Sequence, residues 1–236
     1  MVMDTSRKVL VVTGGSRGIG LATAERFAVD GYDIVNISRT PTPMEGATQI
    51  EADLIDPNWA DAARDVIAKA LAGADSICLV HNSALQVPGE VSQVDIEGFR
   101  NSCEINVVAP AILNLMVLPA MGRGSSIIYI GSTMSKRATR GLTSYIATKH
   151  AVVGLMKATA QDLGGTGIHT ACVCPGFTNT EMLQKYGGEA MAHLASKVHE
   201  NRLIEPAEIA ETIFFAANNP VLNGSVVEAE NCFIEP

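Results

Sequence analysis

Tyr145 and Lys149 lie four positions apart in the segment Ser144-Tyr145-Ile146-Ala147-Thr148-Lys149. On a helix this spacing places both side chains on one face, one turn from each other. A free phenol titrates near ~10 and transfers protons poorly at neutral pH, but a neighbouring ammonium favours the phenolate. Ser132, thirteen residues before Tyr145, could hold the substrate oxygen that the phenol protonates or deprotonates. The three residues therefore predict an acid–base centre.

A glycine-rich turn lies between a predicted strand over residues 8–12 and a predicted helix over 19–29. Glycines let backbone amides approach a pyrophosphate, and the N-terminus of the following helix adds positive potential. A plain strand-to-helix turn is the alternative. The spacing is Gly-x-x-x-Gly-x-Gly, which differs from the usual Gly-x-Gly-x-x-Gly fingerprint. The residues expected to bind the cofactor here are Gly14, Ser16, Arg17, Gly18, Ile19 and Gly20.

The end of the second predicted strand, residues 32–37, indicates which dinucleotide binds. An NAD site normally places Asp or Glu there, about 20 residues past the glycines, to hold the ribose 2′-hydroxyl. Here the position is occupied by Ser38 and Arg39, and Arg17 lies nearby in the glycine-rich turn. Guanidinium and hydroxyl donors suit a 2′-phosphate. The residues predict NADP(H), with the alternative that Arg39 merely solvates the end of a strand.

Apolar strand-like segments alternate with helical ones along the chain. This alternation implies parallel strand pairing with helices on both faces of the sheet. We predict a single α/β domain over residues 1–236, a Rossmann-like doubly wound parallel sheet of about seven strands. The remaining strands are expected at 47–51, 77–80, 126–130, 168–173 and 225–228, and helices from about 57, 92 and 103, and over 143–163 and 206–217.

Together these motifs resemble the short-chain dehydrogenase/reductase family, in family order over nearly the whole chain. The resemblance implies that Asn106 is a fourth catalytic residue, whose side chain and freed carbonyl hold water that resupplies protons near Lys149. An Asn buried and satisfied by neighbouring backbone is the alternative. The resemblance also implies cofactor contacts from Asp53, Leu54, Asn82, Pro175, Gly176, Thr178 and Thr180, in addition to Tyr145 and Lys149.

One of these matches is incomplete, and another has a second explanation that does not exclude the first. In His81-Asn82-Ser83-Ala84 only Asn82 matches the family's Asn-Asn-Ala-Gly, which puts the local geometry in doubt. Asp53, which the resemblance places at the adenine, could also cap the helix expected from Pro57.

The resemblance implies an NADPH-dependent oxidoreductase that interconverts a ketone or aldehyde and its alcohol. Hydride leaves the nicotinamide, Tyr145 donates the proton, Ser132 hydrogen-bonds the substrate oxygen, and Lys149 binds the nicotinamide ribose. The alternative is a non-catalytic dinucleotide-sensing or scaffold protein of the same fold. A sensor would have no need of the intact Ser132, Tyr145 and Lys149.

Substrate contacts are expected from a lid over residues 181–204, for which an ordinary surface helix is the alternative. Met134, Leu142, Phe177 and Met182 are expected to form the pocket wall, which implies a fairly apolar small-molecule substrate. Lys136, Arg137 and Arg140 form a small basic cluster that is more typical of a solvated or intersubunit surface than of an acid-binding site.

Composition and charge exclude several other classes. The net charge of −8 argues against a nucleic-acid partner, and five cysteines without paired zinc spacing predict reduced thiols and no metal. The polar start over residues 1–6 predicts no signal peptide, and the apolar helix over 107–121 is too short to span a membrane. We expect a cytoplasmic homodimer or homotetramer, paired through helices 107–121 and 145–163.

Overall fold

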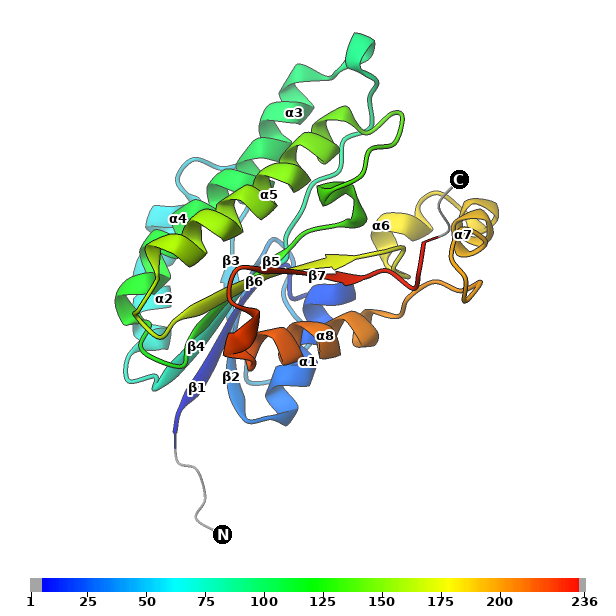
Figure 1. The fold of residues 1–236 in the computed structure, drawn as a ribbon. Coiled ribbons are helices and arrows are strands. Elements are labelled where there is room, and N and C mark those ends of the chain that lie inside the picture. Colours follow the sequence, from blue (N-terminus) through cyan, green and yellow to red (C-terminus); the bar gives the residue numbers. More distant parts are fainter. Residues whose placement is uncertain (1–5, 234–236) are drawn as a thin grey trace.

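The fold, seen here in a computed structural model that describes residues 6–233, is built on one parallel sheet (Figure 1). Most of the polar start, residues 1–5, lies outside the described part of the chain. The sheet has seven strands in the order β3-β2-β1-β4-β5-β6-β7, all paired in parallel, which confirms the predicted fold class. The strands are β1 Lys8–Thr13, β2 Tyr32–Ser38, β3 Thr48–Glu51, β4 Ser76–His81, β5 Ser126–Ile130, β6 His169–Pro175 and β7 Ser225–Ala229.

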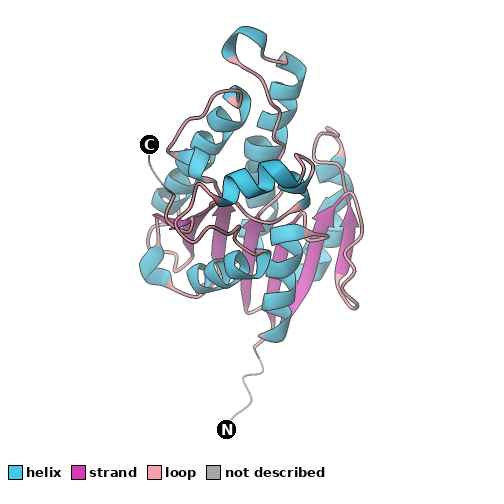
Figure 2. Cartoon of the chain, turned by 90° about the vertical axis from the view of Figure 1, so that its right-hand side faces the viewer, coloured by secondary structure: helices cyan, strands magenta, loops and turns pink. Residues whose placement is uncertain are grey.

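Helices cover both faces of the sheet (Figure 2). On one side lie α1 (Gly18–Val29) and α8 (Pro206–Ala217), and on the other lie α2 (Trp59–Leu71), α4 (Ala109–Val117) and α5 (Thr143–Asp162). Successive side chains of a strand point to opposite faces, so β1 contributes to two cores. Val9 and Val11 pack beneath α2, α4 and α5, whereas Leu10 and Val12 pack beneath α1 and α8.

The helices expected from residues 92 and 103 form instead one continuous helix over 96–120. A short 3-10 turn over Val91–Gln93 precedes it. The helix consists of α3 (Ile96–Cys103), a π-helical turn (Glu104–Val108), α4 and a final 3-10 turn (Leu118–Ala120). Pro110 explains the π turn, because it has no N–H to donate to the carbonyl four residues earlier, that of Asn106.

This joining corrects the expectation that the apolar helix is too short to cross a membrane. At 25 residues the helix is long and apolar enough to do so by length and composition, although this is weak support. The core helix of a soluble protein meets the same criterion, and 33% of the apolar window is buried inside the protein.

The second helix also begins later than expected, at Trp59 rather than near Pro57. The residues before it form successive turns, in which the amide of Asp56 donates to the carbonyl of Asp53 and that of Trp59 to the carbonyl of Asp56. The Asp56 carboxylate accepts the Asn58 amide at 2.9 Å. A local side-chain hydrogen bond therefore replaces the first helical turn.

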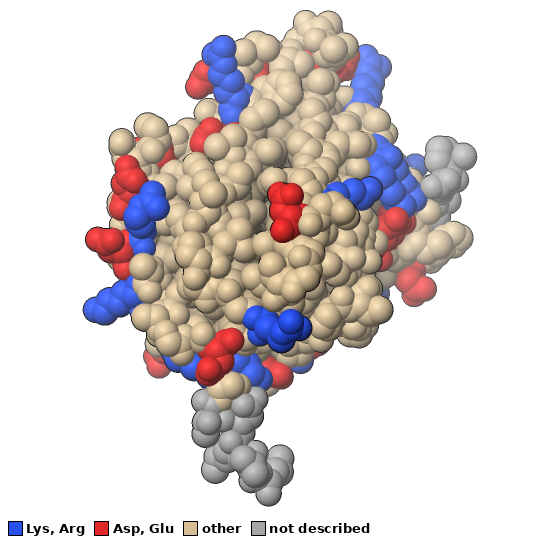
Figure 3. All heavy atoms as spheres, turned by 60° about the vertical axis from the view of Figure 1, so that its left-hand side comes forward, with Lys and Arg blue, Asp and Glu red and all other residues tan. Residues whose placement is uncertain are grey.

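The surface carries charges of both signs. On the face in Figure 3, basic and acidic side chains are interspersed among uncharged ones, and no broad basic patch is visible there.

A chain of buried polar groups crosses the core between β4, β5, α4 and α5. Thr159 donates to the Leu155 carbonyl (2.9 Å), so it accepts the Tyr129 hydroxyl hydrogen (2.9 Å). Tyr129 in turn accepts from the Asn114 amide (2.6 Å), whose oxygen lies 2.8 Å from His81 Nε2. His81 must therefore carry its hydrogen on Nε2. Burial lowers the pKa of His81 from 6.5 to about 4, and the bond to Asn114 opposes this only in part.

We expect this histidine to make the protein acid-labile. Above pH 6.5 His81 is neutral in both the folded and the unfolded chain. As the pH falls toward 4 the unfolded chain binds the proton first, so stability is lost. Between pH 7 and 5 the loss amounts to about 2 kcal/mol. Urea unfolding at the two pH values should show this loss in the wild type and a correspondingly smaller one in His81→Asn. An equal pH dependence in both proteins would contradict the assignment.

Candidate active site

A cleft of about 1390 Å³ opens at the carboxyl ends of the strands, below α6 (Glu181–Gln184) and α7 (Gly188–Ala195). Ligands bind parallel sheets at this edge. The cleft is lined by every predicted site residue except Gly20 and Asn106, which lie behind its wall. The lining residues that were predicted are Gly14, Ser16, Arg17, Gly18, Ile19, Ser38, Arg39, Asp53, Leu54, Asn82, Ser132, Met134, Leu142, Tyr145, Lys149, Pro175, Gly176, Phe177, Thr178, Thr180 and Met182.

Tyr145 and Lys149 lie on the first turns of α5 and face the cleft together. The Lys149 Nζ atom is 5.6 Å from the centre of the Tyr145 ring and donates a 2.7 Å hydrogen bond to the Ile130 carbonyl. Lys149 is only 3% exposed. A buried ammonium is weakly screened by solvent, so its attraction for a developing phenolate is stronger here than it would be at the surface.

Ser132 follows β5 and begins a 3-10 turn over Thr133–Ser135. Its Oγ accepts the Met134 amide at 3.2 Å, and its own amide donates to the Ser135 hydroxyl at 3.1 Å. This reciprocal capping box fixes the direction of the side chain. Because Oγ acts as an acceptor within the turn, the Ser132 hydroxyl keeps its own hydrogen to donate to a ligand.

Two cysteines lie beneath Ser132, and sequence reasoning missed their location. Cys172 and Cys174 are free and buried on β6, with their Sγ atoms 3.8 Å apart. A Cβ atom at Gly131 would lie 2.6 Å from the Cys174 sulfur, so glycine is required there. The hydrogen bond between the two thiols lowers the pKa of Cys174 below that of a free cysteine and raises the pKa of Cys172, which burial raises further.

Asn106 joins the loop after β4 to α5. Its oxygen accepts the Leu85 amide (2.8 Å), and its nitrogen donates to the Leu85 carbonyl (3.0 Å) and to Thr148 Oγ1 (2.9 Å). Every hydrogen of this amide is thus used by protein groups. The alternative of an Asn satisfied by neighbouring backbone describes its side chain well. A role in holding water is therefore left to the main-chain carbonyl, to which Pro110 cannot donate.

The glycine-rich turn has the backbone that its sequence requires. Gly14 and Gly18 adopt positive φ values of 70° and 54°. A Cβ atom at Gly20 would lie 2.2 Å from the Gly14 carbonyl oxygen. Asn82 braces the turn by donating to the Thr13 carbonyl at 2.9 Å, while the Thr13 hydroxyl accepts the Asn82 amide at 3.0 Å. The atypical residues around Asn82 leave this brace intact.

The end of the cleft beside β2 brings together the residues from which the cofactor preference was predicted. Arg17 is exposed at the start of α1. The Arg39 side chain is 67% exposed and lies 3.9 Å from the Asp53 carboxylate. Ser38 differs from expectation, because its hydroxyl already donates to the Thr40 carbonyl at 2.6 Å. Its hydrogen is therefore used inside the protein, whereas the Arg17 and Arg39 guanidinium groups line the cleft.

The opposite end of the cleft contains residues that belong to no sequence motif and were not predicted as site residues. Tyr186, between α6 and α7, donates to Gln86 Oε1 at 3.3 Å across the opening. Phe233 packs edge-to-face on Phe177, with ring centres 5.9 Å apart. Phe233 follows the last strand, where the sequence offers no signal for a cleft position. Tyr186 lies in the expected lid, and only its hydrogen bond to Gln86 shows that it reaches across the cleft.

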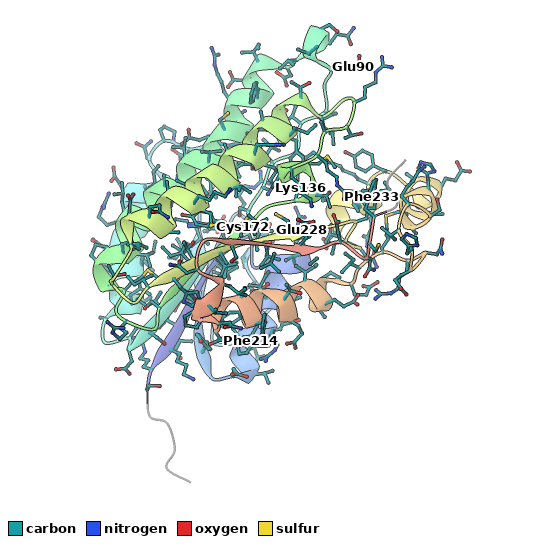
Figure 4. The ribbon with its side chains drawn as sticks, viewed as in Figure 1. Glu90, Lys136, Cys172, Phe214, Glu228 and Phe233 are labelled. Atoms are coloured by element: carbon teal, nitrogen blue, oxygen red, sulfur yellow. The ribbon has the colours of Figure 1, made fainter. Side chains whose placement is uncertain are left out.

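The basic cluster is paired within the chain. Lys136 pairs with Glu228 (Figure 4). Arg137 pairs with Glu230 at 3.3 Å, and Arg140 with Glu90 at 2.8 Å. Glu228 and Glu230, at and just after the end of β7, are therefore partners of the turn that follows Ser132.

Comparisons with known proteins agree with this geometry. The family model described as short chain dehydrogenase matches residues 8–190. The 3-oxoacyl-(acyl-carrier-protein) reductase FabG of Vibrio cholerae is 30% identical over 226 residues, covering 92% of each chain. The meso-2,3-butanediol dehydrogenase of Serratia marcescens is 25% identical over 240 residues, covering 97% of this chain and 95% of that protein. A solved short chain dehydrogenase from Burkholderia cenocepacia, in complex with NADP, is 28% identical with a TM-score of 0.85, covering 96% of this chain and 98% of that chain.

We expect Gly20→Ala to destabilise the protein by about 3 kcal/mol, because the new methyl group overlaps the Gly14 carbonyl. Gly154→Ala is the matched control, since a Cβ atom there meets nothing within 4 Å inside α5. Its helix propensity should stabilise the protein by about 0.5–1 kcal/mol. Denaturant unfolding measures both changes. Equal stability of the two variants would show that the close approach at Gly20 is not needed.

Proposed function

The chain belongs to the short-chain dehydrogenase family, and on that premise we propose that it is an NADP(H)-dependent oxidoreductase. It would interconvert a ketone or aldehyde and the corresponding alcohol. The observation that carries this proposal is the placement of Tyr145, Lys149 and Ser132 together in the wall of one cleft, beside the glycine-rich turn. The family consists of oxidoreductases, whereas the choice of cofactor and substrate is our proposal.

The residues of the cleft fit a dinucleotide. The positive-φ glycines and the N-terminus of α1 suit a pyrophosphate, and the buried Lys149 ammonium suits ribose hydroxyls. Bound NADP(H) would supply or accept the hydride. Tyr145 gives a proton to the substrate oxygen or takes it away, while Ser132 donates a hydrogen bond to the same oxygen as charge develops. Lys149 stabilises the phenolate, and the Asn106 carbonyl holds water that returns the proton.

The preference for NADP(H) is supported at the end of β2. Arg17 and Arg39 line the cleft there, and no carboxylate occupies the position that would hold a ribose 2′-hydroxyl. The Burkholderia cenocepacia relative was solved with NADP. Pro175, Gly176, Thr178 and Thr180 would hold the nicotinamide end, and Asp53 with Leu54 would meet the adenine.

The substrate end supports a fairly apolar carbonyl compound. Met134, Leu142, Phe177 and Met182 line this end of the cleft. Residues 181–204 would act as a lid, since Tyr186 reaches Gln86 across the opening. We propose a cytoplasmic dimer or tetramer, for which the exposed Val108 and Leu115 on the helix over 96–120 would supply apolar contact area.

A non-catalytic dinucleotide sensor of the same fold is the alternative. It would bind the cofactor without turnover. The buried ammonium of Lys149 and the free hydroxyl hydrogen of Ser132 count against it, because a sensor needs neither. NADPH absorbance, followed with a panel of aldehydes, ketones, diketones and 3-oxoacyl thioesters, distinguishes the two and identifies the substrate class.

Tyr145→Phe should lower turnover by at least about 1000-fold and leave the affinity for NADPH nearly unchanged, because only the transferable proton is removed. Tyr32→Phe is the control: this hydroxyl lies at the start of β2, where it contacts Asn218 far from the cleft. Steady-state kinetics and NADPH fluorescence titration measure the two effects. Substantial turnover by Tyr145→Phe would refute the assigned acid–base role.

Arg39→Asp should raise the Michaelis constant for NADPH by about 10-fold and leave that for NADH within about twofold, because it places a carboxylate where the 2′-phosphate would lie. Arg64→Asp, on the outer surface of α2 and similarly exposed, should leave both constants unchanged. An equal rise for both cofactors in Arg39→Asp would remove the basis for the NADP assignment.

A further inference from the structure

Asn36 on β2 is completely buried between the glycine-rich turn and a bend over residues 38–42. We call this bend, which carries Arg39, the corner. Asn36 does not line the cleft, yet its amide contacts the backbone or side chains of both regions. We propose that Asn36 and Gln49 form a positioning pair that holds the 2′-phosphate corner in its binding shape and so favours NADPH over NADH. This inference rests on the proposed NADP(H) function.

On one side the pair holds the turn that binds pyrophosphate. The Asn36 Oδ1 atom accepts the Gly15 amide at 2.7 Å. A Cβ atom at position 15 would lie 2.7 Å from that same oxygen, so the contact requires glycine. This explains a glycine that lies outside the Gly-x-x-x-Gly-x-Gly spacing.

On the other side the Asn36 amide holds the corner. Its Nδ2 atom donates to Ser38 Oγ at 2.8 Å and to Gln49 Oε1 at 2.7 Å. Both hydrogens and the oxygen of the amide are therefore used, as burial requires. Since Ser38 Oγ accepts from Asn36, its own hydrogen goes to the Thr40 carbonyl, which bends the chain back on itself at Arg39.

Gln49 on β3 closes the other end of the same corner. Its Oε1 atom also accepts the Thr42 amide at 3.1 Å, and its Nε2 atom donates to the Ser38 carbonyl at 3.3 Å. Residues 38 and 42 are thus held by one side chain, with Arg39 projecting between them into the cleft. A corner ordered in advance loses less conformational entropy when a ligand binds.

The two halves of the pair act on different parts of the cofactor. The bond to Gly15 shapes the pyrophosphate turn, which NADPH and NADH share. Apart from its bonds to Asn36 and to its own strand, Gln49 contacts only the corner, which a 2′-phosphate would contact and a 2′-hydroxyl would not. Removing Gln49 should therefore change the discrimination between the cofactors, whereas removing Asn36 should weaken both.

The test is fluorescence titration of Gln49→Leu and Asn36→Ala with NADPH and with NADH, which measures dissociation constants without any substrate. For Gln49→Leu we expect the dissociation constant of NADPH to rise by about 10-fold and that of NADH to stay within about twofold. For Asn36→Ala we expect both constants to rise. Gln161→Leu, an exposed glutamine on α5, is the matched control and should leave both unchanged. Thermal melting checks that each variant is folded.

Two outcomes would overturn the inference, and they differ in what else they overturn. A wild type that binds NADPH and NADH equally well would refute the NADP assignment and the positioning pair together. A wild type that prefers NADPH, with an unchanged ratio in folded Gln49→Leu, would refute the pair alone and leave the proposed function standing. Gln49 is only partly buried on the edge strand β3, so this variant keeps the test decisive if Asn36→Ala does not fold.

Discussion

The order of the strands is the constraint on which the rest of the structure depends. Because β1 lies between β2 and β4, the chain leaves β1 and β4 toward opposite faces of the sheet, and a crevice forms between their ends. The glycine-rich turn follows β1, and Asn82 follows β4 and binds back to Thr13. Ser132, Tyr145 and Lys149 are then brought to the same edge by β5 and α5. The strand order and the direction of these connections therefore account for the position of the cleft.

Much of this architecture could be predicted from periodicity alone. The seven strands occur within two residues of their expected ends, because most of them contain a short apolar run rich in Val and Ile. The two helices expected from residues 92 and 103 were the main error. A new helix was expected to begin near residue 103, but the chain stays helical there through a π turn that accommodates the missing amide hydrogen of Pro110.

The site likewise contains residues that could be predicted from the sequence and others that could not. Residues within motifs, such as Tyr145 and Lys149, were located by spacing, because spacing fixes which side chains share a helix face. Contacts that depend on tertiary structure could not be found. Phe233 reaches the cleft only through the path of the chain after β7, and the Asn36 amide bonds to both Gly15 and Gln49, which no local pattern reveals. Hydrogen bonds between distant segments decide such details, and sequence order does not encode them directly.

The ion pairs of Lys136 and Arg137 have a consequence for how the molecule tolerates change. Glu228 and Glu230 lie more than 90 positions further along the chain, yet they hold the turn that begins at Ser132. The final strand and the residues just after it thus hold the turn that carries Ser132 in place. We therefore expect substitutions at Glu228 or Glu230, far from any motif, to change the rate of the proposed reaction more than the stability of the fold.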